Sequence, residues 1–193
     1  MQINQNGRSM VEMLGVLAII GVLSVGGLVI VGKARRQQEI TKAVTEVAQL
    51  IGYAKKVGCQ YDSEYGDFAN MLGQSDAYPG ELEFTYKNGG KSSFTLSSDA
   101  VVEMPYIEGN GDGEAAISHF VVVISNMDED MCVNMATSDW GRKESNGYIG
   151  ASFSDKSDFS GMKKNYPRMD PGTAAENCVQ DTSKLYLGFR ICH

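Results

Sequence analysis

The chain begins with a short polar stretch, followed by an apolar run that extends from Met10 to Val31. Glu12 is the only charged residue in this run. An apolar run of this length is enough for an α-helix to cross the hydrocarbon core of a membrane, which is about 30 Å thick. A carboxylate in such a helix is costly and usually marks function. The pattern therefore predicts a membrane-spanning helix with one acid near its beginning.

After Val31 the pattern becomes that of an amphipathic helix. Apolar residues recur at spacings of four, three, four and three, which places them on one face of a helix. These residues are Ile40, Val44, Val47, Ile51 and Ala54. The polar residues Lys42, Glu46, Gln49 and Lys55 fall outside this stripe, and Gly58 is a suitable end. We expect one continuous helix over residues 9–57, about 70 Å long at ~1.5 Å per residue.

The rest of the chain has the pattern of an α+β domain. Alternating apolar residues on either side of Asn88-Gly89-Gly90 predict a β-hairpin, with Leu82, Phe84 and Tyr86 before the turn and Phe94 and Leu96 after it. The unbroken apolar run from Phe120 to Ile124 predicts a central strand. Further strands are expected at 148–153 and 184–191, and a short helix at 128–135. Together these elements predict an antiparallel sheet packed on the long helix.

The chain has four cysteines, all of which follow the apolar run. They are Cys59, Cys132, Cys178 and Cys192, and none belongs to a C-x-x-C motif. An even, widely spaced set in a membrane-tethered chain predicts two disulfides in an oxidising compartment, with three possible connectivities. The alternative is that they are free buried thiols.

Charge narrows the possible partners and raises a question of orientation. The net charge of −7 argues against nucleic acid as the main partner, because binding phosphates requires a basic surface.

Lys33, Arg35 and Arg36 follow the apolar run directly, and the positive-inside tendency favours the cytoplasm for them. Disulfides require the opposite side. Because a few charges only bias orientation, we place the cysteine-containing part outside the cytoplasm.

The segment Gly7-Arg8-Ser9-Met10-Val11-Glu12 resembles the class III signal of type IV pilins. The resemblance implies that a prepilin peptidase cuts after Gly7, so that Arg8 becomes the N-terminal residue and is N-methylated. Glu12 is then the fifth residue of the mature chain and pairs with the N-terminal amine of a neighbouring subunit. The leader lacks the usual basic residue, and Arg8 replaces a bulky apolar one. A simpler alternative is that Glu12 reaches the lipid headgroups from the helix end.

The surroundings of Cys132 and Cys178 are similar to those in type IVb pilins. One cysteine lies in a short helix after the central strand, and the other precedes the final strand. The resemblance implies a Cys132–Cys178 bridge that closes a variable surface region over residues 133–177. Cys59 and Cys192 then connect the end of the helical stem to the last strand.

The resemblance implies a division into a leader (1–7), a transmembrane and filament-core helix (8–32), an amphipathic stem (33–57) and a globular head (58–193). It further implies a structural subunit of a pilus, or fimbrium, a helical homopolymer that serves functions such as cell adhesion. Its partners are the prepilin peptidase and the inner-membrane assembly machinery. The subunit is expected in the bacterial inner membrane with a periplasmic head, and later in an extracellular pilus.

Two other interpretations remain open. A minor pilin or a type II secretion pseudopilin has the same N-terminus. A membrane-tethered periplasmic binding protein or enzyme that never polymerises belongs to a different class.

Candidate chemistry is sparse. The two histidines, His119 and His193, lie far apart in sequence, and no hydrolase, metalloprotease or nucleotide-binding motif occurs, so we expect no enzyme and no cofactor. In the segment 108–114, Asn110, Asp112 and Glu114 alternate with glycines, as in a loop that wraps Ca²⁺. The spacing is not that of an EF-hand, and we favour a solvated acidic loop.

Overall fold

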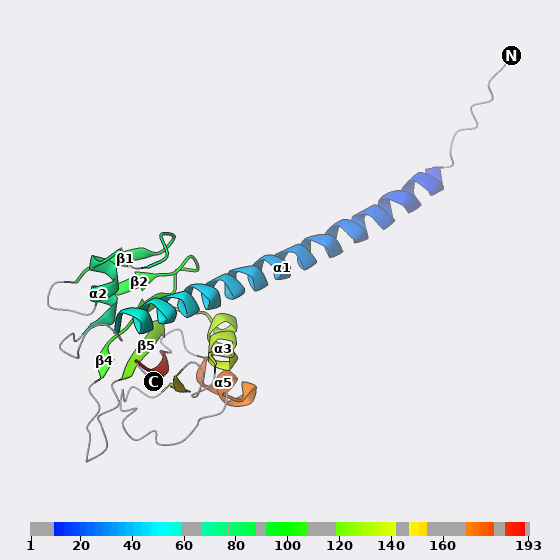
Figure 1. Cartoon of the computed structure of the whole chain (residues 1–193). Helices are drawn as coiled ribbons and strands as arrows, with labels where there is room; N and C mark the ends of the chain where they lie inside the picture. The colour runs from blue at the N-terminus through cyan, green and yellow to red at the C-terminus, as the bar shows by residue number, and fades with distance from the viewer. Residues whose placement is uncertain are drawn as a thin grey trace. The chain divides into compact units, whose positions relative to one another are not determined.

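The computed structural model describes residues 10–58, 67–76, 78–87, 92–107, 119–141, 147–153, 169–179 and 184–191 (Figure 1). For residues 10, 11, 25–29, 106, 107 and 119 it describes the backbone alone. The chain divides into two compact units, Met1–Glu39 and Ile40–His193.

The longest element is helix α1 (Met10–Gly58), which has 49 residues. It confirms the predicted long helix, whose expected bounds were 9–57. The helix contains no proline, so its backbone hydrogen bonds can continue without a break. At its end, a Cβ on Gly58 would lie 2.7 Å from Ile191 Cγ2 and 2.8 Å from Phe68 Cε1. The helix therefore ends where only glycine fits against the head.

Seven described strands form one antiparallel sheet in the second unit. They are β1 (Glu83–Thr85), β2 (Ser93–Thr95), β3 (Val101–Glu103), β4 (Tyr106–Ile107), β5 (His119–Ser125), β6 (Tyr148–Ser152) and β7 (Leu185–Arg190). Their order is β1-β2-β3-β5-β7-β6, and β4 pairs with β5 beside β3. The predicted α+β class with an antiparallel sheet is confirmed.

Strand β5 occupies the centre of this sheet, as its apolar run predicts. It pairs with β3, β4 and β7. Phe120, Val122 and Ile124 belong to the main core, whereas Val121 and Val123 are buried on the opposite face. Because both faces of the strand are buried, its sequence is continuously apolar instead of alternating.

The predicted hairpin is formed by β1 and β2, in which Phe84 lies opposite Phe94. Its predicted turn, residues 88–90, lies outside the described residues. Strands β6 and β7 confirm the two strands expected near the C-terminus. Strands β3 and β4 were not predicted, because each is too short to show a periodic pattern.

Three short helices begin at aspartate N-caps. They are α2 (Phe68–Gln74), α3 (Glu129–Thr137) and α5 (Pro171–Asn177), and their caps are Asp67, Asp128 and Asp170. Each carboxylate accepts hydrogen bonds from backbone N–H groups of the first turn, which have no partner within the helix. Helix α3 confirms the predicted short helix, whereas α2 and α5 were not predicted.

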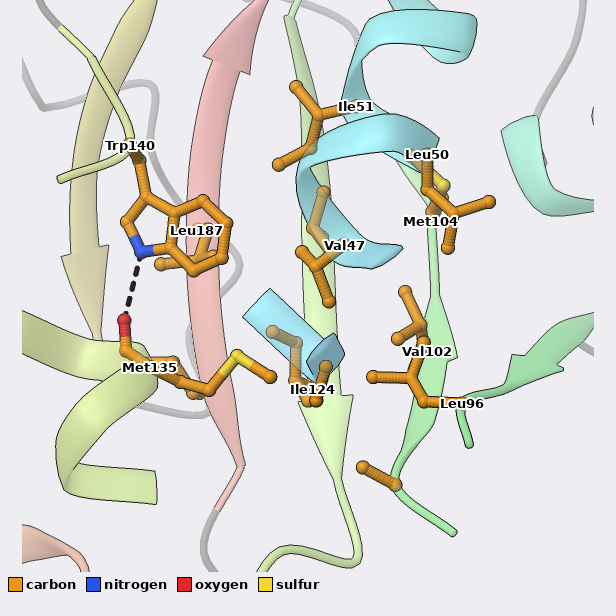
Figure 2. Close-up of a cluster of buried hydrophobic side chains, with 14 of the residues drawn as sticks. Val47, Leu50, Ile51, Leu96, Val102, Met104, Ile124, Met135, Trp140 and Leu187 are labelled. Atoms are coloured by element: carbon orange, nitrogen blue, oxygen red, sulfur yellow. Dashed lines mark hydrogen bonds between the residues drawn. The ribbon is translucent and has the colours of Figure 1, made fainter. Parts of the chain in front are cut away.

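The core lies between the second half of α1 and one face of the sheet. Figure 2 shows Val47, Leu50 and Ile51 of α1 directed toward side chains of the sheet, among them Val102 and Ile124. Four of the five predicted stripe residues are buried, and Val44 is partly buried. Ala43 and Leu50 are fully buried as well, so the buried face is wider than the predicted stripe.

The four polar residues outside the predicted stripe differ in burial. Glu46 is only 4% exposed, and Lys55 is partly buried. Lys42 and Gln49 are exposed. The cause is tertiary, because the turn before β3 covers Glu46 and supplies a hydrogen-bond donor to it.

Candidate assembly site

The first part of α1 exposes an unusual amount of apolar surface. The large apolar side chains that the structure describes there are between 49% and 74% exposed. They are Met13, Leu14, Val16, Leu17, Ile19, Ile20, Val22, Leu23, Ile30 and Val31. We call residues 13–32 the apolar half of α1. Exposed apolar patches of this kind mark sites of protein or membrane contact.

These side chains surround the helix axis instead of forming one face. Successive residues of an α-helix are rotated by about 100°. At that rotation, the eight large apolar residues between positions 13 and 23 leave no sector wider than about 80° uncovered. A single partner helix covers only one stripe of such a surface. The apolar half of α1 can therefore be buried completely only by several neighbours or by lipid.

Glu12 lies in the first turn of α1 and is exposed. At that position the N–H groups of the helix N-terminus present a partial positive charge, which stabilises a carboxylate. Gly7 and Arg8, the predicted processing residues, lie outside the described residues. The structure thus places Glu12 at the start of the apolar half, and its predicted partner remains a prediction.

Among the helices that the structure describes, none has a stretch both long enough and apolar enough to cross a membrane.

In the second unit, α1 is connected to the head by a group of charged side chains as well as by the core. The backbone N–H of Ser97 donates a hydrogen bond to Glu46 Oε2 at 3.1 Å. Lys42 Nζ lies 3.7 Å from Glu46 Oε1 and 3.0 Å from Glu81 Oε2. The hydrogen bond to Glu81 raises the pKa of Lys42. These contacts connect the helix to the turn before β3 and to the segment before β1.

A disulfide joins Cys132 of α3 to Cys178 at the end of α5, with a Cα–Cα distance of 5.7 Å. Helices α3 and α5 lie side by side (Figure 1). Both cysteines are buried, at 1% and 3% exposure. The Cys132–Cys178 bridge that the resemblance implied is therefore present, and it closes a region that contains β6. Cys59 and Cys192 lie outside the described residues.

Trp140 and Tyr148 are two buried aromatic side chains of the main core. The indole Nε1–H of Trp140 donates a hydrogen bond to the Met135 carbonyl oxygen at 2.8 Å, drawn as a dashed line in Figure 2. The rings of Tyr148 and Phe189 pack at an interplanar angle of 51°, with their centroids 5.4 Å apart. Burial, together with the nearby Asp139 carboxylate, raises the pKa of Tyr148 to about 12. Satisfied polar groups and buried rings make this region part of the core.

Sequence reasoning missed one cation in the head. Lys55 of α1 places its Nζ 5.3 Å from the centroid of the Phe189 ring, a cation–π geometry. Partial burial lowers the pKa of Lys55 to about 8. The helical pattern showed only that Lys55 lies beside the apolar stripe, and it carried no signal for this aromatic partner.

The predicted calcium candidates Asn110, Asp112 and Glu114 lie outside the described residues. Within the described part of the chain, no group of three or more His, Cys, Asp or Glu residues is placed to hold a metal ion.

The fold resembles that of a solved pilin. The match is a crystal structure of a type IV b pilin from Salmonella typhi, with a TM-score of 0.52 over 77% of this chain and 97% of that chain. The sequence identity is 15%, so the likeness shows a shared fold. No protein-family model matches the sequence, and no curated protein matches it. The class that the structure defines is thus the pilin fold, a long N-terminal helix on an antiparallel sheet.

Proposed function

We propose that this chain is a structural subunit of a type IV pilus and polymerises through the apolar half of α1. The observation that carries the proposal is the exposure of apolar side chains all around this part of the helix. The likeness of the fold to a type IV b pilin supports it.

The energetic argument is that this surface is unstable in water. Fully burying a large aliphatic side chain contributes about 1.5–3 kcal/mol. Ten such side chains, each about half exposed or more, represent a driving force on the order of 10 kcal/mol for burial. Because the side chains surround the axis, a bundle of neighbouring helices satisfies them better than one partner does. A helical homopolymer provides such a bundle.

In this proposal Glu12 sets the register of the assembly. A carboxylate enclosed by apolar helices loses its hydration, and a facing ammonium group offsets much of that cost. Cleavage after Gly7 would create an amine at Arg8, four residues before Glu12 in the mature chain. The amine of one subunit then pairs with Glu12 of its neighbour. Only a stagger that brings these two groups together avoids an unpaired buried charge.

Before assembly, the same apolar half would hold the subunit in the inner membrane, with the head in the periplasm. The Cys132–Cys178 bridge supports a location outside the cytoplasm, because disulfides persist in oxidising compartments. Prepilin peptidase and the inner-membrane assembly machinery are the proposed partners, and the extracellular pilus is the proposed destination.

N-terminal sequencing of the mature protein tests the proposal. A start at Arg8 is the expected result. Mass spectrometry of the N-terminal peptide would show N-methylation of the Arg8 amine as an added mass of about 14 Da. A chain that retains Met1, or one cleaved after the apolar half, would favour a tethered protein that does not polymerise. The matched control is the Gly7→Ile variant, which should keep Met1 because it removes the glycine at which the proposed leader ends.

A further inference from the structure

The charges along the start of α1 are arranged in layers along the helix axis. Residues 13–32 contain no charged side chain, Glu12 precedes them, and Lys33 follows them. Glu12 and Lys33 are 21 positions apart on one continuous helix, and this separation corresponds to about 32 Å. That length matches the hydrocarbon core of a bilayer, which is about 30 Å thick. The two charges therefore bracket the apolar half at the spacing of two membrane surfaces.

Three basic residues make up the second boundary, and we call Lys33, Arg35 and Arg36 the basic collar. At about 100° per residue, Arg35 is rotated by about 200° and Arg36 by about 300° from Lys33. All three lie within about 4.5 Å along the axis. The three directions therefore span an arc of about 160° at one level of the helix. That level directly follows the apolar half, where a charged layer bordering the apolar half would meet all three side chains.

The collar has charge available for a ligand. Lys33 and Arg35 are exposed, and neither forms an ion pair with any residue that the structure describes. Arg36 Nη1 lies 3.1 Å from Glu39 Oε2, on the side of the collar away from the apolar half. Lys33 and Arg35 therefore contribute most of the collar's positive charge.

We propose that the basic collar binds the headgroups of anionic phospholipids in the membrane that holds the subunit before assembly. This inference rests on the proposed function, because it requires the apolar half of α1 to lie in a bilayer. The net charge of the whole chain is −7, so an anionic surface repels the chain on balance, whereas it attracts the basic collar. The collar would fix the depth of the helix and select the lipids around it.

The expected strength of the preference for anionic lipid follows from the two charges of Lys33 and Arg35. Each Lys or Arg near an anionic surface strengthens binding about five-fold, the ratio equivalent to about 1 kcal/mol. The attraction should weaken with salt, because the Debye length falls from about 10 Å at 0.1 M to about 3 Å at 1 M.

The test uses the full chain reconstituted in phosphatidylcholine vesicles. One sample carries a trace of spin-labelled phosphatidylglycerol, and a parallel sample carries spin-labelled phosphatidylcholine. Electron spin resonance measures the fraction of each label that is immobilised at the protein surface. We expect phosphatidylglycerol to associate at least about five-fold more strongly at low salt, and this ratio should approach one at 1 M salt.

Two double variants complete the test. Lys33→Gln/Arg35→Gln should abolish the preference while circular dichroism shows unchanged helix content. Lys56→Gln/Lys87→Gln removes the same charge from exposed positions of the second unit and should keep the preference. Equal association of both lipids with the wild type, or equal loss in both variants, would overturn the collar's role and leave membrane insertion standing. Absence of any immobilised label would instead refute insertion itself.

Discussion

Ser97 and Glu46 are 51 positions apart in sequence, and the backbone N–H of Ser97 donates a hydrogen bond to Glu46 Oε2 at 3.1 Å. Glu46 is almost fully buried, and its other oxygen, Oε1, has no hydrogen-bond partner among the residues that the structure describes. Lys42 Nζ lies 3.7 Å from Oε1, and Glu81 competes for this ammonium group at 3.0 Å. The helix is thus connected to the head by a buried carboxylate whose hydrogen-bonding capacity is only partly used.

Replacing Glu46 by Ala should destabilise the head by about 2 kcal/mol. A hydrogen bond to a charged acceptor contributes roughly 1.5–3 kcal/mol, and relief of the desolvated Oε1 offsets part of the loss. At about 2–4 °C per kcal/mol for a chain of this size, Tm should fall by about 4–8 °C. The Tm is measured by near-ultraviolet circular dichroism while the protein is heated in a mild non-ionic detergent.

Glu39→Ala is the matched control for Glu46→Ala, because Glu39 lies on the same helix with its side chain 59% exposed. An exposed ion pair contributes about 0–1 kcal/mol, so the Tm of this variant should change by no more than about 4 °C. Equal shifts in the two variants would show that burial of Glu46 has no particular effect on stability.

Glu12→Ala should leave the subunit in the membrane but reduce filament yield at least ten-fold. Without the carboxylate, the N-terminal amine of a neighbouring subunit is enclosed by apolar helices with no counter-charge. Removing one partner of a buried pair costs about 3–5 kcal/mol. Quantifying sheared filaments and membrane-bound subunit from the same cells measures both effects.

Ser24→Ala is the control that tests whether removing any polar side chain of the apolar half reduces filament yield. Ser24 Oγ donates a hydrogen bond to the Ile20 carbonyl oxygen of its own helix, so its loss should leave assembly near the wild-type level. Normal filament yield from Glu12→Ala would contradict its role in setting the register.

Replacing both Cys132 and Cys178 by Ala should lower the stability of the head by about 4 kcal/mol. The bridge closes a sequence separation of 46 residues, and its main effect is to restrict the unfolded chain. The corresponding fall in Tm is about 8–16 °C.

The same bridge should resist reduction while the head is folded, because both cysteines are buried. Thiol labelling of the wild-type protein with reductant, with and without denaturant, provides the control. Rapid labelling of Cys132 and Cys178 under native conditions would contradict the buried position of the bridge.

Lys55 should make the head more stable as the pH rises above about 8. Its pKa falls from about 10.5 to about 8 on burial, so in that interval the unfolded chain binds a proton that the folded chain has lost. The free energy of unfolding therefore increases with pH. Water screens the half-exposed amine and the Phe189 ring favours its charged form, which limits the gain to about 1 kcal/mol.

Urea unfolding at about pH 7 and about pH 9.5 measures this gain, and Lys55→Met should abolish it. The window stays below the range in which Tyr148 acts in the opposite direction, because its pKa of about 12 exceeds its ordinary value of 10. Lys56→Met, at the adjacent exposed position, should keep the pH dependence. If the free energy of unfolding of Lys55→Met still increases between these two pH values, a group other than Lys55 causes the increase.

Local patterns predicted the elements that bury a continuous or periodic set of side chains. The long helix, the hairpin around Phe84 and Phe94, and the central strand β5 all have such sets. Helices α2 and α5 do not, because each is seven residues long and depends on an aspartate cap. Helix α2 depends further on a long-range contact, since Asp67 also accepts a hydrogen bond from the Ser92 backbone N–H at 2.8 Å.

The sequence by itself determined the layered character of α1, because charge and hydropathy are properties of each residue and a helix arranges them at a constant rise. It placed one acid at the start, the basic collar after 20 uncharged residues, and an amphipathic stripe beyond. Only the tertiary structure decided that Glu46 is buried and that Lys55 lies over Phe189. Those environments are created by turns and strands distant in sequence, whose positions depend on how the whole head packs.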